Sequence, residues 1–299
     1  MKVILGVPDR QLPVWELGVP LMINQLNWSS TPPWDNETWV DSGGYQILVH
    51  GDGARPRLRE LIRRYRSIDA DYYVSLDVPT PPCSPPVRET LDYYEELYTR
   101  DLDVIPVVHA YTPEHVDRVL DFYAKYPPRM YAYGGFAPPS SARGVGRYAP
   151  IAIFHYLRRS VSAARLHVLG AGSLAMMGVF RLADSIDTST YRVKAIHGMV
   201  IVPGSGERYV GARTIRWHVR RVTQEELEEL HRFLDVTRYP YEFDLDQWKS
   251  RAMVNAWVLT HSHYNGDFAG VKVSEGMAHM DDYDLRRRAA SLCSRDADT

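Results

Sequence analysis

The stretch Trp39-Val40-Asp41-Ser42-Gly43-Gly44-Tyr45-Gln46 decides how this chain is interpreted. A short apolar strand ends in an acidic side chain, and the two glycines that follow let the backbone approach a ligand closely. Taken alone, an Asp-Ser-Gly-Gly tetrapeptide is more often an ordinary turn. The choice between a turn and a ligand site therefore depends on the rest of the sequence.

Short apolar runs alternate with amphipathic segments of helical length along the first two thirds of the chain. This pattern is typical of βα units around a parallel sheet. The predicted strands are Lys2–Val7, Thr38–Val40, Tyr72–Leu76, Val104–Val108, Met130–Tyr133, Arg165–Leu169 and Asp184–Ile186. The predicted helices between them are Arg57–Ser67, Val87–Arg100, Pro113–Tyr126, Ile151–Ala163 and Leu174–Leu182.

A polar residue or a glycine follows nearly every predicted strand. In a (β/α)₈ barrel the carboxyl ends of all strands meet at one rim, where the active site lies. A doubly wound sheet places ligands only at its switch point, so it accounts for fewer of these positions. Pro106 fits poorly inside its run, because a central strand loses a hydrogen-bond donor there. We therefore predict an α/β fold, a TIM barrel, whose rim carries Asp41, Asp77, His109, Gly134, Gly135, Gly170 and Asp187.

Composition limits the function classes. The 299 residues are 45% hydrophobic and 24% charged, as in ordinary globular proteins, and no apolar run approaches the roughly 18 residues that a membrane span needs. We expect a cytoplasmic protein without membrane contact. Two cysteines, Cys83 and Cys293, cannot form a disulfide framework. The net charge of -2 requires any nucleic-acid binding to come from a local patch.

Five motifs occur in one order: Asp-Ser-Gly-Gly-Tyr-Gln at 41–46, Ser-Leu-Asp at 75–77, Tyr-Gly-Gly-Phe at 133–136, His-Val-Leu-Gly-Ala-Gly at 167–172 and Ile-Asp-Thr-Ser-Thr-Tyr at 186–191. Together they resemble the guanine transglycosylase superfamily over roughly residues 1–210. Members of that superfamily exchange a guanine in a nucleic acid for a 7-deazaguanine base, such as preQ0, on a TIM barrel. The superfamily often forms homodimers, and the resemblance implies no cofactor.

The resemblance implies a role for each matching residue. Asp187 looks like the nucleophile that attacks C1′, and Asp41 like the general acid/base for the departing and arriving bases. Asp77 would bind the Watson–Crick edge of guanine, and the backbone of Gly134 and Gly135 would bind its carbonyl oxygen. Tyr45 and Leu169 would sandwich the base, and the substrate pocket would also include Ser42, Gly43, His109 and Gly170.

The residue types suit this chemistry without the resemblance. Breaking an N-glycosidic bond develops positive charge on the sugar, which one carboxylate traps covalently while a second carboxyl group handles the proton of the leaving group. Two neighbouring acids push their pKa values apart, so that one stays ionised while the other is protonated. An aromatic side chain such as Tyr45 supplies a stacking face for an extruded nucleotide.

Several alternatives stay open at this stage. Asp184 is a rival nucleophile, although it would fall at the start of its strand. His109 is equally suited to a structural role, Asp77 to a turn, and Gly134-Gly135 to a simple loop. Two arginine clusters suit phosphates or plain solvent exposure; they comprise Arg55, Arg57, Arg59, Arg63, Arg64 and Arg66, and then Arg213, Arg216, Arg220 and Arg221.

The chain departs from the tRNA enzymes of the superfamily, whose zinc site uses three close cysteines and a histidine. The matching stretch, 215–227, contains no cysteine, so we predict that the zinc site is lost and that no metal is bound. His261 and His263 lack further ligands. The N-terminal motifs look more like the Dpd-type DNA-guanine transglycosylases, which favours DNA over tRNA as the partner. A 7-deazaguanine nucleoside hydrolase and a non-catalytic nucleic-acid-binding barrel remain as alternatives.

We predict two parts, a catalytic barrel at 1–223 and a helical C-terminal extension at 224–299 that packs on it. From about residue 281, where the sequence turns highly charged, the extension is expected to form a short helix that frays into a mobile tail.

Overall fold

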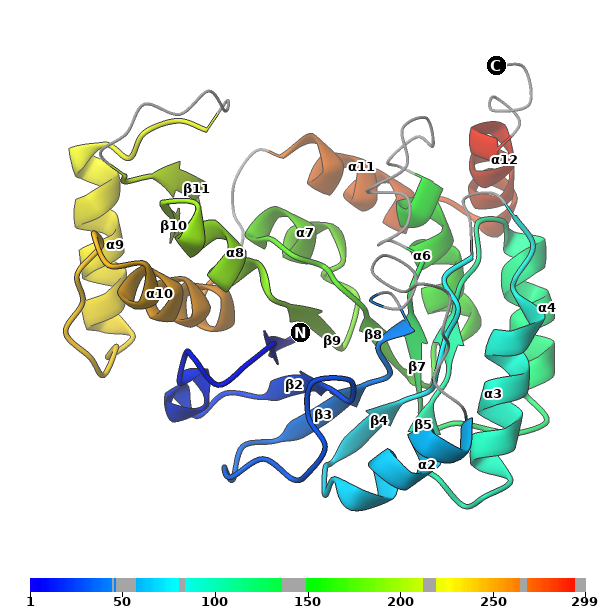
Figure 1. Ribbon diagram of the computed structural model, residues 1–299. Helices are drawn as coiled ribbons and strands as arrows, with labels where there is room; N and C mark the ends of the chain where they lie inside the picture. The colour runs from blue at the N-terminus through cyan, green and yellow to red at the C-terminus, as the bar shows by residue number, and fades with distance from the viewer. Residues whose placement is uncertain are drawn as a thin grey trace.

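The computed structural model describes residues 1–44, 46, 58–80, 84–135, 149–211, 219–263 and 268–293 (Figure 1). Tyr45, which the sequence places against the base, lies outside the described residues, as do Arg55, Arg57, Arg213 and Arg216. Within the described part, the helices are all too short or too polar to cross a membrane.

The first nine described strands form one parallel sheet that nearly closes on itself. In chain order they are β1 (Lys2–Val7), β2 (Leu21–Asn24), β3 (Thr38–Asp41), β4 (Tyr72–Val74), β5 (Val104–Ile105), β6 (Val107–Val108), β7 (Met130–Tyr133), β8 (Arg165–Val168) and β9 (Ser185–Thr188). Their spatial order is β5-β4-β3-β2-β1-β9-β8-β7-β6. The α/β class with a parallel sheet is confirmed, and β2 is a strand that the periodicity analysis missed.

Pro106 lies where the two edges of this sheet meet. It separates β5 from β6, which are the first and last strands in the spatial order. The Ser75 amide donates to the Ile105 carbonyl at 2.9 Å, and the Ala132 amide donates to the Pro106 carbonyl at 2.9 Å. The missing N–H of proline therefore interrupts the run without opening the barrel-like sheet, because the carbonyls on both sides still find donors.

The inside of the sheet is an apolar layer. Its buried members come from seven strands in succession: Ile4, Met22, Trp39, Val74, Ile105, Val107, Met130 and Ala132. A second and larger core lies between the outside of the sheet and the helices. The inner layer fills the interior of the sheet below the carboxyl ends of the strands.

The helices that follow the strands cover the outside of the sheet (Figure 1). They are the 3₁₀ helix η1 (Val14–Leu17) and then α2 (Leu58–Ser67), α3 (Arg88–Tyr98), α4 (Pro113–Tyr123), α6 (Ala149–Ser160), α7 (Leu174–Val179) and α8 (Thr190–Ile196). Local sequence sets their starts. In α4, for example, the Thr112 hydroxyl accepts from the His115 amide, and Pro113 supplies the fixed φ that suits a first turn.

The rest of the described chain consists of an antiparallel hairpin and four helices. These are β10 (Met199–Val202), β11 (Gly206–Tyr209), α9 (Gln224–Val236), α10 (Trp248–His261), α11 (Ala269–Ala278) and α12 (Asp282–Cys293). Figure 1 shows α9 and α10 beside the hairpin, whereas α11 and α12 lie over α7 and α6. Buried Asn255 joins α10 to the barrel side: its amide donates to the carbonyls of Tyr191 and Met199, at 3.2 and 3.1 Å.

Helix α12 begins at Asp282, where the sequence predicts a short helix that frays into a mobile tail. It is held because Arg286 bonds Glu114 and Asp117 of α4, at 2.9 and 2.7 Å. Arg159 of α6 also donates to Asp282 at 3.1 Å. The charged residues that suggested mobility are thus partly ion-paired to the barrel. Residues 294–299 lie outside the described residues.

An ion-pair cluster lies in the described part of residues 215–227, the stretch for which the sequence predicts no zinc site. Buried Glu226 accepts from Arg208 at 2.7 Å and from Arg220, and it forms a capping box with Thr223 at the start of α9. Burial acts to raise the pKa of Glu226, but the Thr223 amide and the two guanidinium groups outweigh it and lower that pKa. Ordinary polar contacts therefore hold this segment.

Candidate functional site

Six residues predicted or found at the rim share the inner face of the sheet. Successive side chains of a strand point to opposite faces, so residues two apart point the same way. Met22, Trp39, Val107 and Ala132 belong to the inner apolar layer, and the ring of His167 packs on Trp39 with centroids 4.9 Å apart. Ser185 bonds that same ring, as described below, so these side chains all lie on the inner face. The residue two positions after each of them in the sequence points to the same face; these residues are Asn24, Asp41, His109, Gly134, Leu169 and Asp187.

Asp41 ends β3 beside the end of β2. Its Oδ2 accepts from the Asn24 amide at 2.7 Å, and it also accepts from the backbone of Gly43, whose φ of +82° turns the chain sharply. Burial, together with the charges of Asp77 and Asp187, raises the pKa of the Asp41 carboxyl to about 7 against these two hydrogen bonds. The carboxyl groups of Asp41, Asp77 and Asp187 therefore act on one another at one end of the sheet.

Asp77 lies in a buried network with Ser42 and His109. The Ser42 hydroxyl donates to Asp77 Oδ1 at 2.8 Å, and His109 Nε2 lies 2.7 Å from Asp77 Oδ2. All three residues are buried, and within the described part of the chain His109 Nδ1 has no hydrogen-bond partner. The network fixes the plane of the Asp77 carboxylate, since each of its oxygens has a donor.

Only glycine fits at position 134, because the ring of His109 packs directly against its backbone. A Cβ at position 134 would lie 2.5 Å from His109 Cε1 and 2.8 Å from Val107 Cγ1, both in the buried interior. We expect Gly134→Ala to displace the imidazole and to lower the free energy of unfolding by roughly 1–3 kcal/mol, the usual cost of overpacking. Urea denaturation measures this change. Gly170→Ala serves as a comparison, because a Cβ there meets nothing within 4 Å and only the positive φ of +69° opposes it. Equal stability of Gly134→Ala and the wild type would contradict the close packing.

Asp187 lies within β9 and is held from one side. Its Oδ1 accepts from the Gly170 amide at 2.8 Å and lies 3.2 Å from His167 Nε2. His167 Nδ1 lies 2.8 Å from the Ser185 hydroxyl, so the serine can donate to Nδ1 while Nε2–H donates to Asp187. Within the described part of the chain, Asp187 Oδ2 makes no hydrogen bond. One carboxylate oxygen is therefore held by two partners, and the other has none among the described residues.

Asp184, the rival nucleophile, lies at the other end of the strand. It precedes β9, and its Oδ2 accepts from the Leu166 amide at 2.7 Å and from Arg158 at 3.0 Å. The Lys2 amide donates to its backbone carbonyl. Asp184 therefore joins the amino ends of neighbouring strands, away from Asp41 and Asp77.

The remaining predicted residues lie beside this site. Leu169 is half-buried against the inner layer, and Gly170 is exposed. Gly134 donates its amide to the Val108 carbonyl at 3.1 Å, so within the described residues Gly135 is left as the backbone donor of that pair. No three His, Cys, Asp or Glu side chains of the described residues converge as metal ligands.

Asn24, Gln25 and His167 are site residues that the sequence interpretation did not assign. Asn24 ends β2, where the apolar run Leu21-Met22-Ile23 carries the same signal as the strands that were predicted. His167 falls inside a quoted motif, and its place two residues before Leu169 puts it on the inner face. Gln25 bonds the carbonyl of Ser42 at 2.9 Å, a contact that has no sequence signature.

Comparison with known proteins identifies one similar chain. It is the uncharacterized protein 306 of Sulfolobus islandicus rod-shaped virus 1, which is 35% identical over 268 residues. The match covers 89% of this chain and 83% of the viral protein. No protein-family model matches the chain.

Proposed function

Because this chain belongs to one family with the uncharacterized viral protein 306, whose name gives no activity, we propose a function from the site itself. The protein is a guanine transglycosylase, a pentosyltransferase that exchanges guanine in DNA for a 7-deazaguanine base. The supporting observation is a pair of acids, Asp41 and Asp187, in contrasting surroundings on one end of a parallel sheet.

The proposal includes a (β/α)₈ barrel. Counting β5 and β6 as one strand interrupted by Pro106 reduces the nine strands of the sheet to eight. These eight follow the chain order around the sheet, and all of their pairings are parallel. In such barrels the site lies at the carboxyl ends of the strands.

Asp187 is proposed as the nucleophile. Its Oδ2 attacks C1′ of the target nucleotide, forming an ester-like C1′–O bond as the bond from C1′ to the guanine nitrogen breaks. The departing guanine takes its proton from Asp41. The incoming 7-deazaguanine then returns a proton to Asp41, and its nitrogen forms the new bond to C1′ while Asp187 leaves as a carboxylate.

Asp41 suits the proton transfers because its pKa of about 7 lets it give and take a proton near neutral pH. Gly170 and His167 suit the nucleophile because they hold Oδ1 and orient the reactive oxygen. The two acids differ in surroundings, which is the arrangement that separates acid and nucleophile roles in retaining glycosidases.

Base recognition falls to the buried network. Asp77, fixed by Ser42 and His109, presents its remaining lone pairs to the N–H groups of the guanine edge. The Gly135 amide is the donor for the guanine carbonyl oxygen, and Leu169 covers one face of the base. Ser42 and His109 are thus positioning residues for Asp77.

Incubation with radiolabelled guanine tests the proposal. We expect label to enter duplex or single-stranded DNA, and unlabelled preQ0 to displace it. Incorporation only into tRNA would show that the exchange is right and the nucleic acid wrong. Release of free base from a nucleoside, with no incorporation, would identify a hydrolase, and nucleic-acid binding without any turnover would identify a binding protein.

A further inference from the structure

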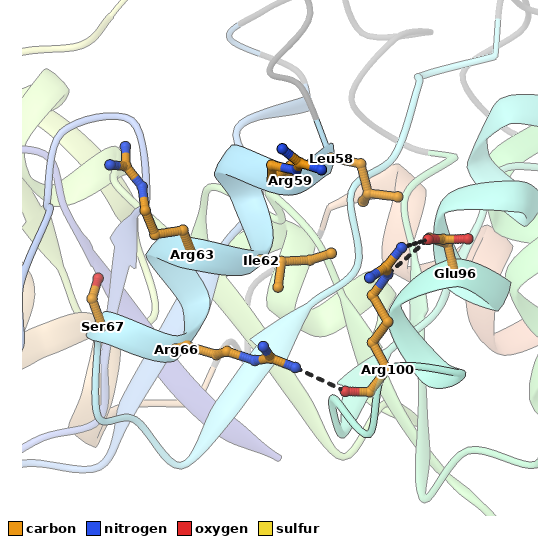
Figure 2. Close-up of a pocket in the computed structure, with 8 residues that line it drawn as sticks. All are labelled: Leu58, Arg59, Ile62, Arg63, Arg66, Ser67, Glu96 and Arg100. Carbon is orange, nitrogen blue, oxygen red and sulfur yellow. Dashed lines mark hydrogen bonds and ion pairs between the residues drawn. The ribbon is translucent and has the colours of Figure 1, made fainter.

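Two hollows flank helix α2 on the outside of the barrel. The larger, about 530 Å³, lies between α2 and the end of α3; Figure 2 shows Arg66 reaching to the backbone carbonyl of Arg100, whose guanidinium group turns to Glu96. The second, about 460 Å³, lies between α2 and the segment that follows β2. Arg63 and Ser67 line both hollows, so the two form one surface across the helix.

Cations dominate this surface. Arg59, Arg63 and Arg66 are spaced by four and three residues, which places them along one stripe of α2. Arg59 and Arg63 are exposed and make no hydrogen bond or ion pair with the described residues. Within the same residues, Arg66 donates to the Arg100 carbonyl alone, at 3.3 Å. Arg64 and Arg100 are paired with Glu60 and Glu96. Five guanidinium groups thus face two carboxylates.

Gln25 connects this surface to the catalytic segment. Arg64 donates to its backbone carbonyl at 3.1 Å and to its side-chain oxygen at 2.9 Å. The backbone N–H of Gln25 donates to the carbonyl of Asp41 at 3.1 Å, and the side-chain amide of Gln25 donates to the carbonyl of Ser42. Gln25 therefore links Arg64 of the basic surface directly to the backbone of Asp41, the proposed acid/base.

We propose that this surface binds the sugar-phosphate backbone of the DNA strand next to the target nucleotide. Unpaired guanidinium groups suit phosphate oxygens, because their fork of N–H donors matches two oxygens at once. A net charge of -2 for the whole chain gives no general attraction to DNA, so a local array of this kind is needed for binding. The inference rests on the proposed function, because it places the strand from which the guanine is taken.

Replacement of the unpaired arginines tests the surface. We expect Arg63→Ala to weaken binding of a fluorescent DNA duplex roughly five- to tenfold at about 0.1 M salt, and Arg59→Ala combined with Arg63→Ala to weaken it further. Each lost phosphate contact lowers the slope of log K against log salt by about 0.9. In the exchange assay the KM for DNA should rise while kcat stays unchanged, because neither arginine touches the reacting atoms.

Arg232→Ala is the matched control, since Arg232 is an exposed arginine of α9 without a partner among the described residues. It should leave DNA affinity and salt dependence unchanged. Unaltered affinity of the double variant would overturn the surface, even if base exchange is observed. Affinity that depends on Arg59 and Arg63, without any exchange by the wild type, would support the surface and refute the transglycosylase.

Discussion

Asp187→Asn is expected to abolish the covalent protein–DNA adduct and to lower base exchange at least about 10³-fold, since the amide cannot displace guanine from C1′. The variant should still fold. Its side-chain oxygen can accept from the Gly170 amide as the carboxylate does, so the turn after β8 keeps its partner. Denaturing gel electrophoresis of the enzyme with labelled DNA detects the adduct, and guanine incorporation measures the exchange.

Asp184→Asn separates the nucleophile from its rival. Asp184 bonds the Leu166 amide and Arg158 at the opposite end of β9, so the substitution should lower stability and leave the adduct intact. An adduct that survives in Asp187→Asn and disappears in Asp184→Asn would reverse the assignment. Loss of the adduct in both variants, with both folded, would also contradict it, because Asp184 has no described contact with the other acids.

The sequence predicted the strands that carry the site because each is a short apolar run followed by a polar residue or glycine. It missed β2, which lies close behind β1 and follows Pro20 without an intervening helix of ordinary length. It also treated residues 104–108 as one strand. The structure divides that run at Pro106, because the sheet accepts hydrogen bonds there through carbonyls alone.

The site was less predictable than the fold. Asp41 and Asp187 could be predicted as candidate site residues because a carboxylate at a strand end has a sequence signature. The contact of Ser42 and His109 with Asp77 has none, because it joins segments 35 and 32 residues apart that meet only when neighbouring strands come together. His167 was quoted in a motif, but its contact with Asp187 depends on the register between β8 and β9, in which His167 pairs with Ser185.

Asp41→Asn is expected to make the protein more stable and nearly inactive. The carboxyl group titrates near 3.8 when unperturbed, whereas burial raises its pKa in the fold to about 7, helped by the charges of Asp77 and Asp187. Between these two values the folded state binds more protons than the unfolded state, so the free energy of unfolding falls as pH rises. This decrease in the free energy of unfolding is complete above pH 7, and it is absent below the pKa of the unfolded state. A difference of about three pKa units corresponds to an upper value of about 4 kcal/mol.

Asparagine carries no charge, so the variant escapes this loss. At pH 8 Asp41→Asn should exceed the wild type in unfolding free energy by roughly 2–4 kcal/mol, and the difference should shrink by about 1.4 kcal/mol per unit as pH falls from 7 toward 4. Base exchange should fall about 10²–10⁴-fold, because the amide cannot carry the proton. Urea denaturation at pH 4.5 and pH 8 measures the first effect, and guanine incorporation the second. Asp121→Asn, an exposed carboxylate on α4, should shift stability by less than about 0.5 kcal/mol at either pH. A stability difference between the two proteins that is the same at pH 4.5 and pH 8 would mean that ionisation of Asp41 costs the fold nothing, and the proposed acid/base would lose its physical basis.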